Sequence, residues 1–414
     1  MNDRDYMLRA IELAKKGVGW TSPNPMVGAV IVKDGVIIGE GFHERCGQLH
    51  AERNAIKSLR ESAEGGTIYV TLEPCCHYGR TPPCTEAIIE NKIARVVIGS
   101  RDPNPLVSGK GAKILREHGI EVVEDFMREE CDEINPVFFH YITKKTPYVL
   151  MKYAMTLDGK IACRTGASKW ITGEKARAHV QKLRGEYSAV LAGIGTVLAD
   201  DPMLNCRTEG AHQPLRVIVD SSLRIPMDSQ LVKTANEFPV LVAYANADEE
   251  KIAALEKAGV QTICLPTKNV SADQNIQEAA EGFAAAVPDP NTASLKKQTE
   301  KASEADNSAA TIDNVCTSSV DLTALMHYLG EQQIASVLVE GGGEIHESIL
   351  RSGLADHVCA YIAPKLLGGR DANTPVEGLG VDVPDNGAQL CNMKFTRLDE
   401  DILLEYDVKK CFSK

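Results

Sequence analysis

The first 146 residues alternate between helix-type and strand-type spacing of apolar side chains. Apolar residues at helical spacing behind Asp3 predict a helix that Asp3 caps and that ends near Gly17. Two β-branched runs joined by an Asp-Gly pair predict a hairpin over residues 29–42. Strands and helices then alternate up to a closing helix around residues 127–144. The pattern predicts an α/β domain, residues 1–146, in which helices cover a sheet.

A short polar run over residues 143–147 ends in proline and marks a predicted domain boundary. Beyond it, apolar strand-like runs each lead into a polar, turn-rich segment, and helical segments separate them. The strand-like segments are residues 147–159, 188–202, 214–226, 239–245, 260–266 and 334–343. This repeated strand–helix alternation predicts a second α/β domain, residues 147–414.

Residues 268–320 do not fit the alternation. Only 8 of these 53 residues are Leu, Ile, Val or Phe. A segment so poor in large apolar side chains buries too little surface to offset the entropy lost on ordering. We therefore expect a poorly ordered insertion that takes no part in catalysis.

Composition and charge narrow the class of protein. The formal net charge is −12, whereas a general nucleic-acid binder normally carries a basic surplus. The first ten residues lack the basic start and apolar core of a secretory signal, and no run approaches the roughly 18 apolar residues of a membrane helix. Twelve cysteines are too sparse for a disulfide scaffold, so clustered ones indicate metal binding or catalysis. We expect a cytoplasmic protein that contacts neither nucleic acid nor membrane.

A histidine, an acid and two cysteines occur in the order that metal-assisted hydrolysis needs. His50 and Glu52 open one helical pattern, and Cys75 and Cys84 follow the next strand. One imidazole and two thiolates supply the three protein ligands of a catalytic zinc, which keeps an open position for water. Glu52 can carry a proton to a leaving amine without touching the metal. We predict that His50 and Cys84 each lie at the start of a helix.

Two alternatives stay open for these residues. They could be ordinary buried cysteines and a core histidine, although the complete set in this order argues against that. They could also form a structural zinc site with four protein ligands, in which Cys76 or His77 supplies the fourth. The structural site would leave Glu52 without a purpose.

The His-x-Glu and Pro-Cys…Cys pattern resembles the zinc nucleobase deaminases. Eight residues separate the two cysteines here, whereas two are common. With this longer loop, SPNPMVGAVIV (22–32) and SRDPNP (100–105) resemble the deaminase half of the bifunctional deaminase–reductases of riboflavin biosynthesis. The family usually has serine where this chain has Cys76. The resemblance implies a cytidine-deaminase-like, three-layer first domain that holds Zn²⁺.

The same resemblance implies a pyrimidine that carries a ribose phosphate as the substrate. An asparagine amide can read a ring edge because it both donates and accepts hydrogen bonds, and arginine offers a forked donor to an anion. The implied contacts are Asn24 for the ring, His43, His77 and Arg80 for the phosphate, and Asp102 and Asn104 for the ribose hydroxyls.

A strand, three glycines and a helix follow one another around Glu340 in the second half. Glycines let a pyrophosphate approach the backbone, and a helix N-terminus favours its charge. The usual G-x-G-x-x-G fingerprint is missing. Five motifs resemble, in order, the reductase half of the same family: KYAMTLDGKIA (152–162), SKWITG (168–173), AGIGTVLADDPMLNCR (192–207), RVIVDSSLRIP (216–226) and APKLLGG (363–369). That half looks like the dihydrofolate reductase fold, which implies an α/β domain that binds NADPH.

The resemblance carries over residue by residue. The residues implied to line the NADPH site are Ala154, Trp170, Thr196, Asp200, Ser222, Gly342, Gly343 and Glu344. The residues implied to hold the substrate are Ser168, Arg184, Leu204, Arg207 and Glu340, with both arginines facing its phosphate. Lys152 and Asp200 are candidates for proton supply during the reduction. Core packing is the alternative for Trp170, and a solvated turn is the alternative for Asp200.

These features together predict one chain with two consecutive activities. The first half would hydrolytically deaminate 2,5-diamino-6-ribosylamino-4(3H)-pyrimidinone 5′-phosphate. The second half would use NADPH to reduce the ribosyl group to a ribityl chain, and we expect a homo-oligomer. A nucleic-acid-editing protein on a deaminase fold is a rival, against which the acidic balance argues. A non-catalytic scaffold with a structural zinc is another, and it predicts that metal removal unfolds the first half.

Overall fold

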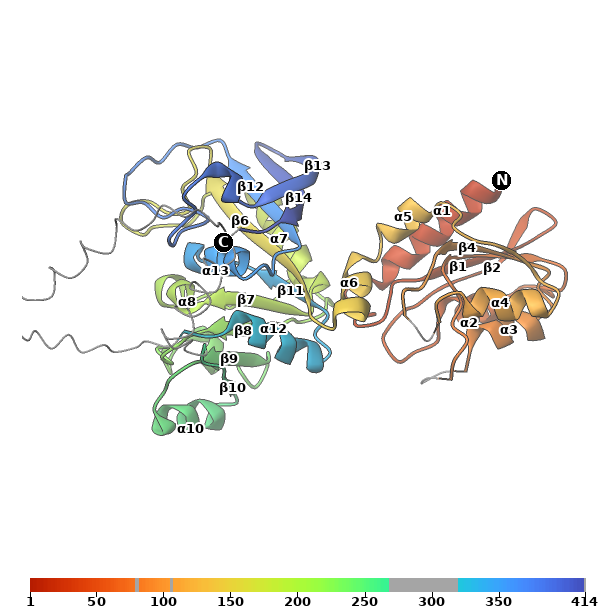
Figure 1. The fold of residues 1–414 in the computed structure, drawn as a ribbon, viewed down its shortest axis with the longest axis horizontal. Coiled ribbons are helices and arrows are strands. Elements are labelled where there is room, and N and C mark those ends of the chain that lie inside the picture. The colour runs from red at the N-terminus through yellow and green to blue at the C-terminus, as the bar shows by residue number, and fades with distance from the viewer. Residues whose placement is uncertain (79–81, 105–106, 268–318, 413–414) are drawn as a thin grey trace, which may run out of the picture.

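The structure is a computed structural model that describes residues 1–78, 82–104, 107–267 and 319–412. It has two α/β halves, which meet beside helix α6 (Pro136–Lys144) (Figure 1). The predicted insertion lies almost wholly in residues 268–318, outside the described residues. Its last residue is described, however: Val320 is buried and pairs with Pro266 in an isolated bridge. The described residues therefore include Ser319 and Val320, the last two residues of the predicted insertion.

The first half is built on a five-stranded sheet in the order β2-β1-β3-β4-β5. Its strands are β1 (Gly28–Lys33), β2 (Val36–Phe42), β3 (Thr67–Leu72), β4 (Arg95–Ser100) and β5 (Glu121–Val123). β1 runs antiparallel to β2 and β3, which confirms the predicted hairpin, and β3, β4 and β5 are parallel.

Helices cover both faces of this sheet, so the first half has three layers. Its other helices are α1 (Asp3–Ala14), η1 (Lys15–Gly17), α2 (Ala51–Lys57), α3 (Cys84–Glu90), α4 (Lys110–Glu117) and α5 (Arg128–Asp132). α1 and α5 bury apolar side chains on one face, and α2, α3 and α4 bury theirs on the other. Asn2, rather than the predicted Asp3, caps α1, because its side chain accepts the amide proton of Asp5. The predicted closing helix is two helices, α5 and α6.

The second half is built on a nine-stranded sheet in the order β10-β9-β8-β7-β11-β6-β12-β14-β13. Its strands are β6 (Tyr148–Thr156), β7 (Ala189–Gly193), β8 (Leu215–Val219), β9 (Val240–Tyr244), β10 (Gln261–Cys264), β11 (Ser336–Val339), β12 (His357–Ala363), β13 (Gln389–Leu398) and β14 (Asp401–Lys410). The strands from β10 to β12 in this order are parallel, while β14 and β13 are antiparallel additions at one edge.

Two apolar cores lie on the two faces of the large sheet. Its helices are α7 (Glu174–Glu186), α8 (Ile194–Asp200), α9 (Gln230–Lys233), α10 (Glu249–Lys257), α12 (Leu322–Glu331), α13 (Gly343–Arg351) and η2 (Pro384–Asn386). α7, α8, α9 and α10 contribute to one core, and α12 and α13 contribute to the other. No helix in the described ranges is long and apolar enough to cross a membrane.

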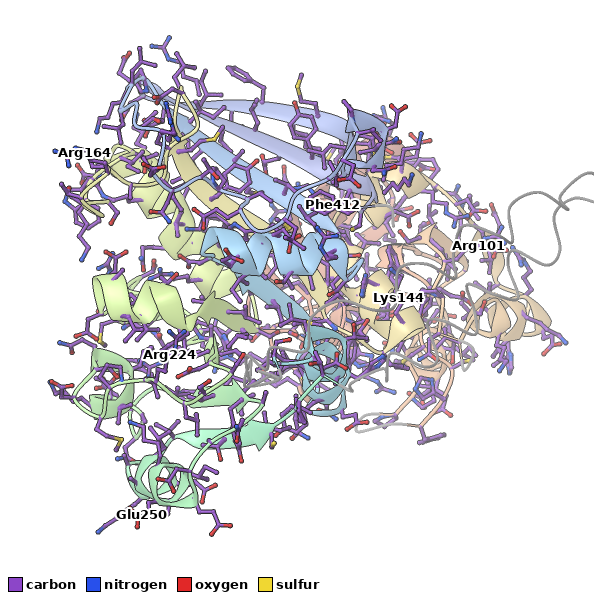
Figure 2. The ribbon with its side chains drawn as sticks, turned by 60° about the vertical axis from the view of Figure 1, so that its left-hand side comes forward. Arg101, Lys144, Arg164, Arg224, Glu250 and Phe412 are labelled. Carbon is purple, nitrogen blue, oxygen red and sulfur yellow. The ribbon has the colours of Figure 1, made fainter. Side chains whose placement is uncertain are left out.

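Figure 2 shows where charged side chains lie on this framework. Lys144 lies at the end of α6, where the halves meet, and its Nζ is 3.7 Å from Asp356 Oδ1 of the second half. Arg101 and Glu250 extend from the outer parts of the first and second half, respectively. The junction is therefore partly ionic, whereas the two sheets depend on apolar cores.

Candidate functional site

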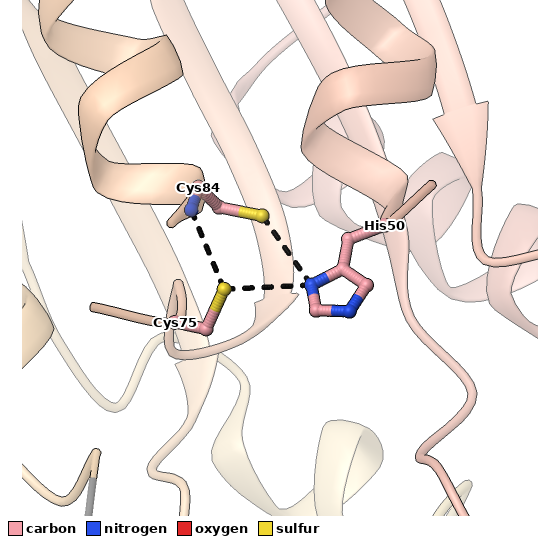
Figure 3. Close-up of side chains that lie close together, drawn as sticks. All are labelled: His50, Cys75 and Cys84. Carbon is pink, nitrogen blue, oxygen red and sulfur yellow. Dashed lines mark hydrogen bonds between the residues drawn. The ribbon is translucent and has the colours of Figure 1, made fainter. Parts of the chain in front are cut away.

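Three metal-capable side chains meet at the entrances of two helices in the first half (Figure 3). His50 Nδ1 lies 3.4 Å from Cys75 Sγ and 3.5 Å from Cys84 Sγ. His50 is the N-cap of α2, and Cys84 is the first residue of α3, as the sequence predicts. The donor set and its convergence fit a tetrahedral zinc with three protein ligands and one open position.

The pKa shifts of the two thiols favour binding of a cation. The pKa of Cys75 is lowered to about 4, chiefly by a hydrogen bond from Cys84 and also by one from His50, although burial opposes the shift. The hydrogen bond to Cys75 and burial raise the pKa of Cys84. The pair therefore retains one thiolate near neutral pH, and a bound divalent cation favours loss of the second proton.

The four-ligand alternative finds no support in the described residues. Neither Cys76 nor His77 belongs to the group that His50, Cys75 and Cys84 form. A second group of possible ligands, His357, Cys359 and Glu405, lies in the second half. Its Cys359 Sγ and Glu405 Oε1 are 3.9 Å apart, and His357 Nδ1 is already hydrogen-bonded to Asp407. The first group is therefore the better zinc site.

Glu52 lies in the first turn of α2 beside the metal-capable group but outside it. The residue is only 3% exposed. Burial raises the pKa of its carboxyl, and the neighbouring Cys75 charge raises it further. A carboxyl whose pKa lies above its usual range can accept and release a proton near neutral pH. This is the position and the environment that a proton carrier needs.

A cavity of about 360 Å³ opens beside these residues. Of the substrate residues that the sequence predicts for the first half, all the described ones line this cavity: Asn24, His43, His77, Asp102 and Asn104. Arg80 lies outside the described residues. Within the described residues, the buried Nδ1 atom of His77 has no hydrogen-bond partner, so this atom can bind a ligand.

His43 does not match the predicted phosphate contact. Its side chain is 2% exposed, its Nδ1 lies 3.1 Å from Leu49 O, and its Nε2 lies 3.3 Å from Asn24 Nδ2. Burial lowers the pKa of the imidazole, so it is neutral and its two nitrogens are occupied. The geometry instead indicates that His43 orients the Asn24 amide.

Asp102 is the other perturbed acid of this cavity. Burial raises its pKa to about 6, and the nearby Glu73 adds to the effect, while a hydrogen bond from the Asn104 amide opposes it.

The sequence analysis missed several residues of this cavity. One is Glu73, which is buried and accepts hydrogen bonds from the backbone N–H groups of Gly109 and Ala112. Others are wall residues from the junction of the halves: Phe138, Tyr141, Ile142 and Gln333. No local motif marks those four, because tertiary packing alone brings them to the cavity.

The second half contains a larger cavity of about 1170 Å³. The sequence-predicted residues that line it are Lys152, Ala154, Ser168, Trp170, Arg184, Thr196, Asp200, Leu204, Arg207, Glu340, Gly342, Gly343 and Glu344. Ser222 is the exception, since its neighbour Ser221 lines the wall instead. Trp170 is 61% exposed and lies under the Arg177 guanidinium, which excludes the core-packing alternative.

Three largely buried charges form a network in the wall of this cavity. Glu340 Oε2 lies 3.0 Å from Lys152 Nζ, and its carboxylate receives two hydrogen bonds from Arg184 at 2.5 and 2.9 Å. Burial opposes ionisation of Glu340, but the charges of Arg184 and Lys152 outweigh it and lower the pKa of the carboxyl. Arg184 therefore neutralises Glu340 and does not project freely toward a phosphate. This differs from the prediction that Arg184, like Arg207, faces the substrate phosphate. The guanidinium of Arg207 has no ion pair in the described chain.

The three glycines after β11 differ in how strictly their positions require glycine. Gly341 has a φ of +100°, which favours glycine. A Cβ on Gly343 would lie 2.7 Å from Thr374 O, so only glycine fits there. A Cβ on Gly342, the N-cap of α13, would meet only Thr196 Oγ1, at 3.8 Å. The backbone at the start of α13 is therefore open to the cavity, as a phosphate-binding turn requires.

Asp200 lies on the same wall at the end of α8. Its Oδ1 accepts a hydrogen bond from Ser168 Oγ at 3.1 Å, and its backbone carbonyl accepts one from Lys169 Nζ at 3.4 Å. The side chain is thus tied to the 168–170 segment, so the solvated-turn alternative does not describe it. Two residues predicted for different ligands, Ser168 and Asp200, are hydrogen-bonded to each other.

Removing the charge of Glu340 should destabilise the second half. Glu340→Gln leaves two buried cations without a carboxylate, so we expect a loss of about 3–5 kcal/mol in the free energy of unfolding. The Glu340 pKa is lowered from 4.5, so its ionisation stabilises the fold at neutral pH, and this contribution begins to decline as the pH falls below about 4.5 and is lost only below the folded-state pKa. Urea-induced unfolding, followed by circular dichroism at pH 7 and at pH 4, measures both effects. The exposed Glu344→Gln is the control, and equal midpoints for the two variants would contradict the prediction.

Comparisons with known proteins cover both halves. Residues 1–100 match the family model of the cytidine and deoxycytidylate deaminase zinc-binding region, and residues 147–404 match that of the RibD C-terminal domain. The riboflavin biosynthesis protein RibD of Actinobacillus pleuropneumoniae is 49% identical over 409 residues, which cover 99% of this chain and 96% of that protein. The Escherichia coli protein of the same name is 36% identical over 381 residues, 89% of each chain.

Solved structures agree with the sequence relatives. Acinetobacter baumannii RibD, form 1, is 35% identical, with a TM-score of 0.77 over 99% of both chains. The Thermotoga maritima diaminohydroxyphosphoribosylaminopyrimidine deaminase/5-amino-6-(5-phosphoribosylamino)uracil reductase is 37% identical, with a TM-score of 0.73 over 98% of both chains. The fold, the zinc-type donor set and these relatives lead to one conclusion: the chain belongs to the RibD family of bifunctional riboflavin biosynthesis enzymes, with a deaminase half followed by a reductase half.

Proposed function

We propose that residues 1–146 hydrolytically deaminate 2,5-diamino-6-ribosylamino-4(3H)-pyrimidinone 5′-phosphate, and that residues 147–414 reduce the ribosyl group of the product with NADPH. The observation that carries the first step is the convergence of His50, Cys75 and Cys84 beside the buried Glu52. The name of the T. maritima relative gives both activities. The family-model match that begins at residue 147 supports the division between the halves.

His50, Cys75 and Cys84 would hold the zinc ion. When bound, zinc supplies a Lewis acid that makes water more acidic and leaves it ready to attack the ring carbon bearing the amine. The orientation of these ligands comes from the fold: the backbone N–H of Cys84 donates to Cys75 Sγ at 3.3 Å, and the entrances of α2 and α3 fix the other two ligands. The ion therefore needs little reorganisation of the chain.

Glu52 would move the proton that hydrolysis requires. Its carboxylate would accept a proton from the attacking water and pass it to the amine, which leaves as ammonia. The raised pKa of the buried carboxyl suits both transfers. Around it, Asn24 would read the pyrimidine edge, Asp102 and Asn104 would bind the ribose, and His77 and Arg80 would face the phosphate, while His43 holds Asn24.

The larger cavity would hold NADPH and the deaminated product side by side. Gly342, Gly343 and Glu344 at the start of α13, with Ala154, Thr196, Asp200 and the exposed Trp170, would bind the cofactor, which supplies the hydride when bound. Ser168, Leu204, Arg207 and Glu340 would bind the substrate, with Arg207 facing its phosphate and Arg184 fixing Glu340. Lys152, which points its Nζ at Glu340, and Asp200 are the candidates to supply the proton that completes the reduction.

We also propose a homo-oligomer in the cytoplasm. Strand β13 is the last strand of the large sheet. Large apolar side chains on it are exposed to solvent: Leu390 by 40%, Met393 by 62% and Phe395 by 59%. An exposed sheet edge with apolar side chains favours pairing with another chain. A second copy of this chain would cover that surface.

The first prediction from this proposal concerns metal content. Cys75→Ser and Cys84→Ser should each lose most of the zinc, because each removes one of three protein ligands. Cys76→Ser is the matched control and should retain one zinc per chain. Elemental analysis of the purified full-length variants measures the ratio. Equal zinc loss in all three would contradict the assignment of the ligands.

The second prediction separates the two activities. Glu52→Ala should retain zinc but release ammonia from the pyrimidine substrate roughly 100-fold or more slowly, because the general acid–base group is lost. The same variant should still oxidise NADPH when it is given the deaminated intermediate. Parallel assays of ammonia release and NADPH oxidation test both halves. Robust ammonia release by Glu52→Ala would refute the role of Glu52, and failure of the wild-type chain in both assays would refute the proposed function.

The third prediction concerns the exposed edge. The wild-type chain should have at least twice the monomer mass in solution at micromolar concentration, and Phe395→Glu should reduce that mass by placing a charge in the contact. Light scattering coupled to gel filtration measures the change. Lys409→Glu, on the neighbouring strand β14, is the control, because it changes the net charge by −2, more than the −1 of Phe395→Glu, without removing an apolar side chain. A monomeric wild-type chain would overturn the proposal of a homo-oligomer.

A further inference from the structure

The reductase half contacts the deaminase half at the C-terminal end of helix α12. The C-terminal end of α12 in the second half meets α6 at the junction (Figure 1), and Tyr141 Oη of α6 donates a hydrogen bond to Gly330 O of α12 at 3.0 Å. The contact is close, since a Cβ on Gly330 would lie only 2.1 Å from the backbone oxygen of Lys145. The C-terminal turn of α12 therefore packs directly on the end of α6.

This packing places a reductase residue in the wall of the deaminase cavity. Phe138, Tyr141 and Ile142 of α6 line the cavity, and so does Gln333, two residues beyond the end of α12. Gln333 has a φ of +62°, and its N–H donates to Gly330 O at 3.0 Å, so a tight turn fixes its backbone. Its side chain is exposed. Gln333 is the one lining residue of this cavity, among the described residues, that comes from beyond residue 147.

A second contact supports another side of the same cavity. Ser22 Oγ lies 2.9 Å from Ser188 Oγ of the reductase half, and the Trp20 ring meets the edge of His212, with ring centres 5.9 Å apart. Ser22 lies two residues before Asn24, which lines the cavity. The loop with the pyrimidine-reading asparagine thus rests on the reductase half.

We propose that Gln333 is a substrate-binding residue of the deaminase reaction, supplied by the reductase half of the same chain. The inference rests on the proposed deamination of a phosphoribosyl pyrimidine. The amide of Gln333 can donate to a phosphate or carbonyl oxygen and accept from a ribose hydroxyl or a ring amine. A contact made equally to substrate and transition state changes KM and leaves kcat unaltered. The two halves therefore share one binding wall, and the reductase half is a structural part of the deaminase.

Steady-state kinetics of the full-length zinc enzyme test the proposal. Gln333→Ala should raise the deaminase KM roughly 2- to 10-fold, the worth of one hydrogen bond, with kcat little changed. Gln333→Glu keeps the length of the side chain but places an anion beside a phosphorylated substrate, so its KM should rise further. Gln332→Ala, a change at the adjacent exposed residue that is outside the cavity wall, should have the wild-type KM.

The reductase reaction provides the internal control. Gln333 does not line the larger cavity, so KM and kcat for the deaminated intermediate should be unchanged in all three variants. Wild-type deaminase KM values in both Gln333 variants would overturn the proposal, and so would an equal rise in Gln332→Ala. These results are distinct from failure of the proposed function, in which the wild-type chain itself would release no ammonia and the inference would fall with it.

Discussion

Parallel strand order is the constraint on which both sites depend. The carboxyl ends of parallel strands meet at one edge of a sheet, and the following helices begin there with free N–H groups. In the first half, Cys75 follows β3 and Asp102 follows β4, its parallel neighbour. In the second half, α8 begins after β7 and Glu340 follows β11, again on paired parallel strands. Residues that are distant in sequence thus meet without any special folding of the loops.

The two cavities solve the problem of buried charge in different ways. In the deaminase half, a hydrogen bond between Cys75 and Cys84 lowers the pKa of one thiol and raises that of the other, and burial raises the pKa of Glu52. Groups whose protonation can change suit a site that must bind a metal ion and transfer a proton. In the reductase half, Lys152 and Arg184 keep Glu340 ionised. Fixed charges suit a site where the cofactor supplies the chemistry and the protein orients the ligands.

The junction connects the two halves and also forms part of the deaminase cavity wall. α6 contributes to the apolar core of the first half through Phe138, lines its cavity and hydrogen-bonds α12 of the second half. A displacement of α12 against α6 would therefore change the shape of the deaminase cavity. This arrangement gives a physical reason for keeping the two consecutive activities on one chain. The reason does not require that substrate passes from one half to the other.

The sequence by itself determined the local features of this protein. Short-range spacing and residue chemistry predict the hairpin, the helix starts at His50 and Cys84, the strand–glycine–helix turn before α13 and the convergent donor set that could hold a metal ion. The antiparallel β13 was not predicted, because most of its residues are exposed and it has no clear alternation of buried positions.

Only the tertiary structure decided which partner each charged or polar side chain has. The family resemblance implied a phosphate contact for Arg184, yet packing places this residue against Glu340, 156 residues away. Burial lowers the pKa of His43 and favours its neutral form, although the hydrogen bond to the Leu49 carbonyl opposes this shift. Gln333 has no motif at all, and it reaches the deaminase cavity because α12 packs on α6. Spacing along a chain specifies residue types and local conformation, whereas burial and long-range contacts set protonation and the composition of a cavity wall.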